Sequence, residues 1–282
     1  MEGKICMITG ANTGIGFEIA KGLAAKGADV VLVCRNETKG QAALTNIREQ
    51  TGNSNIHLML CDLSSQEAIH QLVQDFTSSF GVLDVLVNNA GALFFEKTLS
   101  RDGIEMNLAT NYLGAFLLSE LLVDCLEKAP SARVVNVVGR LHRKGKIFLE
   151  DLQFERQSYN VLKAGTQAVL AKTIFTYEFD RRYQAKGIRA SGFHPGQVDS
   201  DFMRNAPAIV RWLKPLIRPF MLNTKQAAEP GIYLASSPEL EGQGGLYFER
   251  MKQMKSSPAT YDLGLASALW DASVTLTSLQ SS

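Results

Sequence analysis

The sequence predicts a doubly wound α/β domain with a mostly parallel sheet of seven strands. Two observations carry this prediction. Short apolar runs typical of buried strands alternate with longer stretches that space their apolar residues as a helix does. These stretches are long enough to cross over a sheet, which favours parallel strands covered on both faces. No linker, low-complexity stretch or internal repeat interrupts the pattern, so we expect one domain over residues 1–282.

The expected elements can be placed in order along the chain. Apolar runs predict strands at residues 4–9, 30–34, 56–61, 82–87, 133–138, 188–193 and 245–248. Helical spacing predicts helices at residues 15–26, 38–50, 65–80, 106–128 and 165–184.

Residues 199–225 break this alternation. Between Asn205 and Asn223 the segment mixes large apolar side chains with basic residues and prolines. Its place and composition predict a helical lid over a hydrophobic small-molecule substrate. As alternatives, the basic residues could make peripheral contact with a membrane surface or simply face solvent.

The overall composition excludes several classes of protein. The chain has 29 Lys and Arg against 28 Asp and Glu, and this near balance argues against broad contact with nucleic acid. The four cysteines form no CxxC pair, so neither a metal site nor a disulfide framework is predicted, and a reduced, cytoplasmic location fits best. We find no signal peptide and no apolar run of about 18 residues, so no membrane span is expected.

A glycine-rich turn follows the first expected strand and reads Thr9-Gly10-Ala11-Asn12-Thr13-Gly14-Ile15-Gly16. Its glycines allow a tight turn and a close approach of the backbone to a phosphate, while the next helix points its N-terminus at the anion. Because the turn joins a strand to a helix, it predicts a dinucleotide-binding fold of the Rossmann type. The residues expected to contact the coenzyme are Gly10, Asn12, Thr13, Gly14, Ile15 and Gly16. The alternative is an ordinary strand-to-helix turn.

Two further strand ends bear on the choice of coenzyme. Arg35 ends the second expected strand, where an acidic residue would bind the ribose 2′-hydroxyl of NAD. An arginine there favours the 2′-phosphate, and therefore NADP(H), unless it is simply solvated. Asp62 and Leu63 end the third expected strand. Asp62 could accept a hydrogen bond from the adenine amino group, or it could cap the next helix.

Five motifs occur in a recognisable order: the Thr9–Gly16 turn, Asp62-Leu63, Asn88-Asn89-Ala90-Gly91, Asn111 and His194-Pro195-Gly196. With them the chain resembles the short-chain dehydrogenases/reductases, and within them the retinol-dehydrogenase-like group, from about Gly3 to Trp270. The resemblance implies NADP(H) lying across the strand ends, and hydride transfer between nicotinamide and a carbonyl or alcohol. It also implies roles for single residues. Asn89, Ala90 and Gly91 would support the adenosine side, Pro195, Gly196 and Val198 would line the nicotinamide, and Asn111 would hold a water in a proton relay.

The residues that carry the chemistry of these relatives are substituted in this chain. The relatives use a serine that orients the substrate carbonyl and a tyrosine that donates or removes a proton. They also use a lysine that lowers the pKa of the tyrosine and binds the nicotinamide ribose. The serine pair falls at Val138-Gly139 here. Counting back without a gap from the matching stretch 170–179 places Gly165 at the tyrosine and Val169 at the lysine. We therefore expect a reaction centre without the usual proton donor.

Tyr159 and Lys163 satisfy the Tyr-x-x-x-Lys pattern six residues upstream. A shift of six residues along a helix moves a side chain by about 9 Å and turns it by about 240°. We therefore interpret Tyr159 as a structural residue that precedes the helix. The alternative is that a rearranged helix start brings Tyr159 and Lys163 to the nicotinamide.

Three other polar residues lie near the predicted centre. His142 could approach a substrate or brace its loop, and His194 is expected to brace the loop after the sixth strand. Lys172 lies one helical turn beyond Val169, and we expect its amine to be solvated.

Three functions remain open from the sequence. The first is an NADPH-dependent reductase whose substrate needs no tyrosine acid, such as an iminium ion or a conjugated alkene. The second is a non-redox cyclase or isomerase that orients a hydrophobic molecule. The third is a catalytically silent nucleotide-binding protein. The resemblance also implies a homodimer or homotetramer that pairs through the helices at 106–128 and 165–184.

Overall fold

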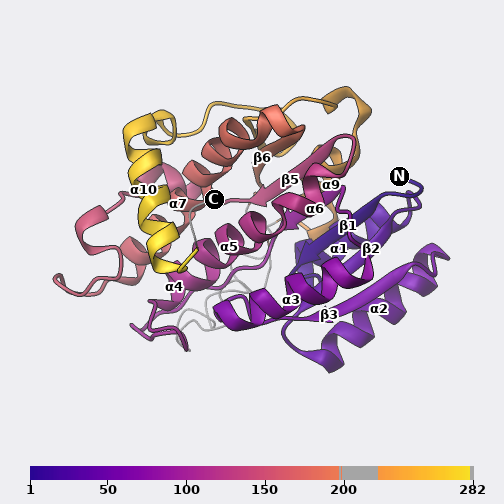
Figure 1. Cartoon of the computed structure of the whole chain (residues 1–282), viewed down its shortest axis with the longest axis horizontal. Coiled ribbons are helices and arrows are strands. Elements are labelled where there is room, and N and C mark those ends of the chain that lie inside the picture. Colours follow the sequence, from indigo (N-terminus) through magenta and orange to yellow (C-terminus); the bar gives the residue numbers. More distant parts are fainter. Residues whose placement is uncertain (197, 199–221, 280–282) are drawn as a thin grey trace.

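One twisted sheet of eight strands runs through the protein, for which a computed structural model describes residues 1–196, 198 and 222–279 (Figure 1). The strand order is β3-β2-β1-β4-β5-β6-β7-β8, and only the pairing of β7 with β8 is antiparallel. The strands are β1 (Ile5–Thr9), β2 (Asp29–Cys34), β3 (Ile56–Leu60), β4 (Val85–Asn88), β5 (Ala132–Val137), β6 (Ile188–His194), β7 (Leu246–Glu249) and β8 (Lys252–Gln253).

The doubly wound architecture is confirmed, but the predicted number of seven strands is wrong by one. The additional strand, β8, has two polar residues and no apolar side chain. It exists because the chain turns back after β7 and pairs Glu249 with Lys252. Hydrophobic patterning does not detect such a short edge strand.

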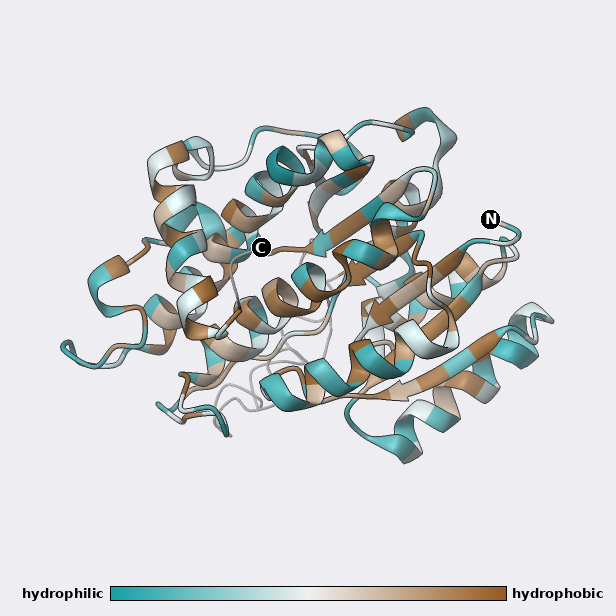
Figure 2. Cartoon of the chain, in the orientation of Figure 1, coloured by the Kyte–Doolittle hydropathy of each residue, from teal (hydrophilic) through white to brown (hydrophobic). Residues whose placement is uncertain are grey.

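Helices cover both faces of the sheet and bury an apolar core on each side (Figure 1). One face carries α1 (Gly14–Ala24), α2 (Glu37–Thr51) and α9 (Thr224–Ser236), and the other carries α3 (Gln66–Ser79), α5 (Gly114–Leu121) and α7 (Val161–Tyr183). Within β1, Cys6 and Ile8 enter the first core while Met7 enters the second, as the two-residue period of a strand requires. Figure 2 shows the central strands largely in the hydrophobic colour.

The long helix expected at residues 106–128 is interrupted. It consists of α4 (Met106–Leu108), a π-helical turn (Ala109–Leu113), α5, and α6 (Val123–Glu127) after a break at Leu122. Apolar periodicity continues across these interruptions, so the sequence pattern could not reveal them. The π-helical turn matters for function because it contains Asn111.

The helix expected at 165–184 begins four residues earlier, at Val161. The side chain of Asn160 caps it by accepting hydrogen bonds from the amides of Leu162 (3.0 Å) and Lys163 (3.1 Å). Tyr159 therefore precedes α7 and lies outside the helix.

A C-terminal helix, α10 (Leu263–Leu276), was not expected and packs beside α7 (Figure 1). Its Trp270 ring lies 5.0 Å from the ring of Phe116 on α5 and 6.1 Å from that of Phe175 on α7. The hydroxyl groups of Ser273 and Tyr112 are 2.6 Å apart. The helix thus covers the outer side of α5 and α7 with an aromatic cluster.

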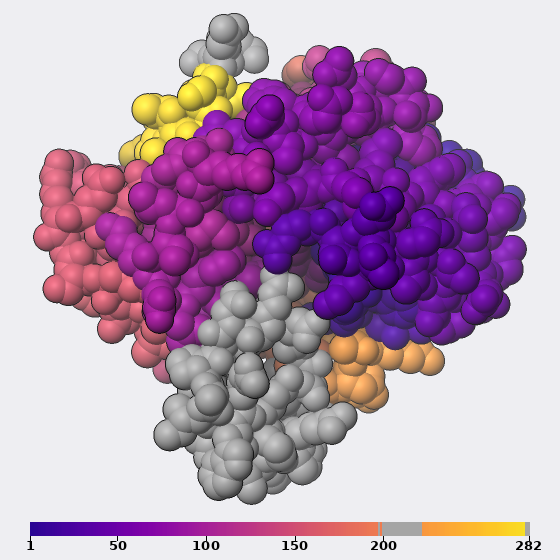
Figure 3. All heavy atoms as spheres, turned by 90° about the horizontal axis from the view of Figure 1, so that it is seen from below, coloured from indigo at the N-terminus to yellow at the C-terminus, as the bar shows by residue number. Residues whose placement is uncertain are grey.

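The predicted lid at 199–225 lies largely outside the described residues. Its last part is corrected, since Thr224 and Lys225 are the first turn of α9, which Asn223 caps. In the space-filling view, the indigo and purple N-terminal segments fill one side of the molecule and the segment near residue 150 projects at the opposite side (Figure 3). No helix among the described residues combines the length and apolar character that a bilayer-crossing segment needs.

Candidate functional site

The predicted cradle lies between the end of β1 and the start of α1. Gly10 and Gly14 adopt φ angles of +65° and +62°, which side chains disfavour. Thr13 occupies the N-cap position, but its side chain makes no capping hydrogen bond. The first amides of α1 are therefore left without a side-chain acceptor, which suits an anion at the helix N-terminus.

Close backbone packing joins the cradle to the segment after β4. The Asn89 amide donates from Nδ2 to the carbonyls of Thr9 (2.9 Å) and Gly10 (3.2 Å). A Cβ at Gly16 would lie 2.5 Å from the Gly10 oxygen and closer still to Asn89 Nδ2. Only glycine fits at position 16 without a shift of the backbone, and this packing fixes the turn.

Thr9 opens the predicted turn, but a role for its side chain was not predicted. Its Oγ1 accepts hydrogen bonds from the backbone amides of Asn89 and Ala90, each at 3.0 Å, and it donates to the Val87 carbonyl at 3.3 Å. Thr9 is 1% exposed. A threonine as the last residue of an apolar strand, directly before the glycine turn, was the available signal.

Arg35 and Asp62 stand close together at neighbouring strand ends. The Arg35 guanidinium is 3.7 Å from Asp62 Oδ2, and both side chains remain about half exposed, at 57% and 42%. Asp62 Oδ1 accepts from the amide and hydroxyl of Ser64, while Ser65 rather than Asp62 caps α3. Arg35 is thus only loosely paired and remains accessible to an anion.

The segment after Gly91 is anchored by Asn111 in the π-helical turn. Asn111 Oδ1 accepts from the Ala92 amide (2.9 Å), and Nδ2 donates to the Ala92 carbonyl (2.7 Å) and the Asn107 carbonyl (3.1 Å). Its side-chain amide therefore holds the backbone that follows Asn89-Ala90-Gly91. The structure places Asn111 as an anchor of this loop.

The three substituted positions of the predicted centre come from two elements that face each other. Gly139 follows β5, and a Cβ built there would lie 3.4 Å from Cγ1 of Val169 on α7. Gly165, one turn earlier on α7, would place a Cβ 2.7 Å from Cδ1 of Leu93. The wall formed by these residues is apolar and has no side-chain proton donor.

Tyr159 and Lys163 are held in different surroundings. The Tyr159 hydroxyl donates to the Phe94 carbonyl at 2.9 Å and accepts from Asn107 Nδ2 at 2.8 Å. Burial, and then the nearby Glu105 carboxylate, raise the pKa of Tyr159. Lys163 is exposed and its ammonium lies 5.9 Å from the centre of the Phe148 ring. The two side chains do not share a helix face, because Tyr159 precedes α7.

Lys172 contradicts the expectation that it is solvated. Its side chain is buried in the polar layer between α7 and the sheet, with the residue only 4% exposed, and Nζ donates to the Asn88 carbonyl at 2.7 Å. Burial lowers the pKa of Lys172 from 10.5 to about 7. The sequence could not show this, because the helix is buried on more sides than its apolar pattern suggests.

Two histidines brace the loops around the centre. His142 is fully buried, its Nδ1 donates to the Gly139 carbonyl at 2.7 Å, and its ring packs edge-on against Tyr247. Burial lowers the pKa of His142. His194 Nδ1 accepts from the Arg140 amide at 3.3 Å, and burial lowers its pKa to about 4. Both imidazoles are therefore neutral near pH 7, and the bracing roles agree with these contacts.

The loop after β6 contains the residues expected beside the nicotinamide. Pro195 and Gly196 follow β6, and Gly196 has a φ of +91°. Val198 forms a parallel bridge with Leu222, so these two residues lie side by side. A Cβ at Gly196 would lie 2.6 Å from Leu222 Cδ1, so glycine permits this contact.

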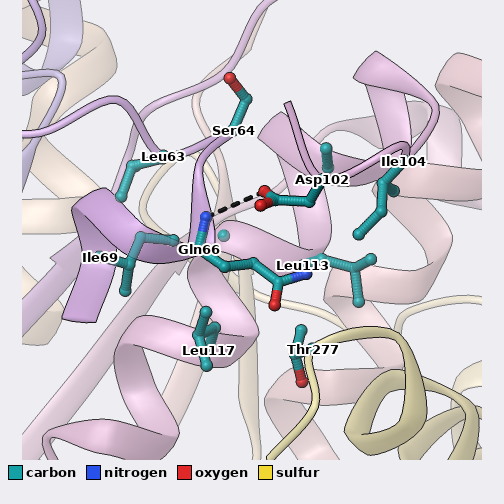
Figure 4. Close-up of a pocket in the computed structure, with 11 residues that line it drawn as sticks. Leu63, Ser64, Gln66, Ile69, Asp102, Ile104, Leu113, Leu117 and Thr277 are labelled. Carbon is teal, nitrogen blue, oxygen red and sulfur yellow. Dashed lines mark hydrogen bonds between the residues drawn. The ribbon is translucent and has the colours of Figure 1, made fainter. Parts of the chain in front are cut away.

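A pocket near the start of α3 is too small for an organic ligand (Figure 4). Its lining residues include Leu63, Ile69, Leu113 and Leu117. The backbone amide of Gln66 donates to a carboxylate oxygen of Asp102 at 3.0 Å beside the pocket. Its space of about 10 Å³ corresponds to roughly one water molecule. This pocket is therefore a packing defect and is not a substrate site.

Comparisons with known proteins agree with the order of motifs. The family model described as short chain dehydrogenase matches residues 4–209. Retinol dehydrogenase 12 of Mus musculus is 37% identical over 99% of this chain and 88% of the relative. A solved structure of an uncharacterised protein from Mycobacterium paratuberculosis has a TM-score of 0.80 and 30% identity, and covers 98% of this chain and 94% of its own. A short-chain dehydrogenase from Shigella flexneri, solved with NADP, has a TM-score of 0.69 and 21% identity, and covers 89% and 98%.

Proposed function

The chain belongs to the short-chain dehydrogenase family, and we propose that it binds NADP(H) and transfers hydride to or from a hydrophobic small molecule without a tyrosine acid. The observation that carries this proposal is the contrast between a tightly built cradle and an apolar wall at Gly139, Gly165 and Val169. The close packing of the glycine turn against Asn89 favours a protein that binds its coenzyme and uses it in the reaction.

The residues of the cradle fit a dinucleotide. The uncapped N-terminus of α1 would bind the pyrophosphate, and Gly10 and Gly14 would let the backbone approach it. Asn89 would hold the turn in place from the side of β4. When bound, the nicotinamide would supply or accept hydride.

Arg35 supports a preference for NADP(H) over NAD(H). Its guanidinium is 57% exposed and lies at the end of β2, where a ribose 2′-phosphate would approach. Asp62 is 3.7 Å away and would compete weakly for the arginine in water. We expect the phosphate to displace this exposed ion pair.

The apolar wall restricts the substrate to one that needs no proton from the protein at the moment of hydride transfer. General acid catalysis contributes typically about 10² to 10⁴-fold, so its loss would slow the reduction of an ordinary ketone severely. An iminium ion accepts hydride without a proton, and a conjugated alkene could take its proton from solvent afterwards. Leu93, Val169 and the glycines favour an apolar substrate surface in either case.

The test combines coenzyme binding with turnover. NADPH and NADH are titrated against the full chain by fluorescence, and absorbance of the reduced nicotinamide is then followed with imines, enones and retinoid aldehydes. We expect tighter binding of NADPH, and consumption of coenzyme with an imine or enone but not with the aldehydes. Product formed without coenzyme consumption would instead identify the non-redox cyclase or isomerase.

A catalytically silent nucleotide-binding protein is the second candidate. The simultaneous absence of polar side chains at Gly139, Gly165 and Val169 favours it. Tight NADPH binding with no turnover of any substrate class would select this function.

A further inference from the structure

Leu93, in the segment that follows β4, fills a notch in the face of α7. A Cβ built at Gly165 on α7 would lie 2.7 Å from Leu93 Cδ1, which is closer than a real Cβ approaches another atom. Apart from α7 itself, no other atom of the described residues lies within 4 Å of that position. Leu93 therefore occupies space that any side chain at position 165 would need.

This notch belongs to the apolar wall of the reaction centre. Gly165 and Val169 are four residues apart on α7 and so lie on the same face of the helix. Val169 is also the residue that a Cβ at Gly139, after β5, would contact. Because β4 and β5 are neighbours in the sheet, Leu93 and Gly139 reach this face from segments that follow adjacent strands. Ligands of doubly wound sheets bind at these carboxyl ends of the strands.

Two buried asparagines hold the backbone on both sides of Leu93. Asn111 pairs with the amide and the carbonyl of Ala92, at 2.9 and 2.7 Å. Asn107 does the same for Phe94, since its Oδ1 accepts from the amide at 3.1 Å and its Nδ2 donates to the carbonyl at 3.0 Å. The residues Asn111 and Asn107 are 6% and 0% exposed. Leu93 is thus held in place although it belongs to no helix or strand.

These features distinguish Leu93 from an ordinary core leucine. A leucine that served only the core would be fully buried, whereas Leu93 is only partly buried and keeps some apolar surface open. Loops usually vary in conformation, but four hydrogen bonds from buried side chains restrict this one. A preformed apolar wall of this kind is typical of a small-molecule site.

We propose that Leu93 is the specificity-determining residue of the reaction centre and restricts it to substrates that are narrow at the carbon that exchanges hydride. The proposal rests on the proposed function, since it assumes that the nicotinamide lies beside the wall of Gly139, Gly165 and Val169. With glycine at 165 alone, the wall would have a hollow that a bulky substituent could enter. Leu93 closes this hollow from the side of β4.

The test measures binding and does not require turnover. The full chain in excess NADP⁺, which cannot reduce an imine, is titrated by calorimetry with pyrroline imines that carry a methyl, isopropyl or phenyl group on the imine carbon. We expect the original chain to bind the methyl imine more tightly than the phenyl imine. Leu93→Ala should shift the ratio of these two dissociation constants by about tenfold or more toward the phenyl imine, because apolar pockets discriminate substituents by such factors.

Gly165→Ala probes the same space from the other side. Its methyl group would push Leu93 toward the substrate and should weaken binding of the phenyl imine most. Leu93→Ala combined with Gly165→Ala refills part of the space and should return the ratio toward that of the original chain, since the two side chains share one site and their effects do not add. The matched control, Leu99→Ala, changes a leucine that is 57% exposed in the same segment and should leave the ratio unchanged.

An unchanged ratio in a folded Leu93→Ala variant would overturn the proposal, because Leu93 would then only pack against α7. Absence of binding of all three imines to both the original chain and this variant would overturn it as well. Failure of the proposed function gives a different result, in which no imine consumes NADPH while the binding ratio still shifts with Leu93. Thermal unfolding of each variant identifies a loss of fold.

Discussion

The coenzyme cradle follows β1 and the reaction centre follows β5, with β4 between them in the same sheet, yet the two regions differ in how closely their residues are constrained. At Gly16 an added Cβ would meet the Gly10 carbonyl and the Asn89 amide, so even one methyl group does not fit. At Gly139 the same addition would meet the two Val169 methyl groups at 3.4 and 3.9 Å and the Leu141 backbone nitrogen at 3.8 Å, all ordinary contact distances. The cradle thus retains close packing that a bound dinucleotide would need, whereas position 139 of the centre has space for a side chain that it lacks.

The largest expected effect comes from restoring the missing groups. Gly139→Ser, Gly165→Tyr and Val169→Lys together should raise NADPH-dependent reduction of a hydrophobic aldehyde by about 10² to 10⁴-fold, the usual value of general acid catalysis. A Cβ added at 165 would lie 2.7 Å from Leu93 Cδ1, so the Leu93 side chain must shift in this variant. Absorbance of the reduced nicotinamide measures the gain. A folded variant that binds coenzyme but shows no gain would contradict our assignment of these positions.

The cradle should lose affinity for NADPH when the packing of its glycine turn is disturbed. Gly16→Val should weaken NADPH binding by about a hundredfold, because the backbone of the turn must move away from Asn89. Gly139→Ala is the matched control and should bind NADPH as the original chain does. Fluorescence titration measures both. Equal effects of the two variants would remove the contrast between the two regions.

Burial of Lys172 should make stability depend on pH. Its pKa is about 7 in the folded protein against an ordinary value of 10.5, so the unfolded chain binds more protons between these values and stability rises with pH across this window. Lys172→Met removes this penalty and should stabilise the protein at pH 7 by an amount on the order of 4 kcal/mol. Above pH 10.5 the difference should vanish.

Urea unfolding of the Lys172→Met variant and the original chain, measured from pH 6 to pH 10.5, checks this prediction. A difference in stability that does not change with pH would mean that the amine of Lys172 keeps its ordinary pKa. Lys163→Met makes the same substitution at an exposed lysine of α7 and serves as the control.

Arg35 should determine which coenzyme is bound. Arg35→Glu removes a cation that would contact the 2′-phosphate and should weaken NADPH binding by roughly tenfold or more, since hydrogen bonds to charged groups contribute about 1.5 to 3 kcal/mol. NADH has no such phosphate, and a glutamate at this strand end can accept from its ribose 2′-hydroxyl, so NADH should bind at least as tightly as before. Parallel titrations of the two coenzymes measure the effect, and equal losses for both would show that Arg35 does not contact the phosphate.

The smallest effects are expected at the upstream Tyr-x-x-x-Lys pattern. Tyr159→Phe should cost only about 1 kcal/mol of stability, through lost hydrogen bonds with Phe94 and Asn107, and should not alter turnover. Lys163→Met should change neither property. A large loss of turnover in both variants would mean that this pair reaches the nicotinamide after all.

Much of the fold could be predicted from the apolar patterns that buried strands and helices show. The expected strand ends lie within a few residues of the observed ones, because a fully buried strand must be apolar along its length. The π-helical turn around Asn111 and the two-residue β8 leave no such pattern. The helix α9 was missed because Pro230 lies inside it and suggests a break.

The residues of the candidate site could be predicted from the sequence only where the backbone conformation requires a particular residue type. Glycines at 10 and 14 are needed for positive φ angles, and their spacing is visible in the sequence. The burial of Lys172 could not be predicted, since it depends on which faces of α7 are covered. Thr9 was overlooked because its side-chain contacts with Asn89 and Ala90 are distant in sequence.

The helix α10 has a consequence for self-association. Trp270 stacks with Phe175 and receives Arg182 over its ring at 4.2 Å, while Ser273 meets Tyr112. The flank of α5 and α7 through which the resemblance implied pairing of subunits is therefore already taken by the chain's own tail. We infer that a homo-oligomer that pairs through this flank would have to include α10 in its interface.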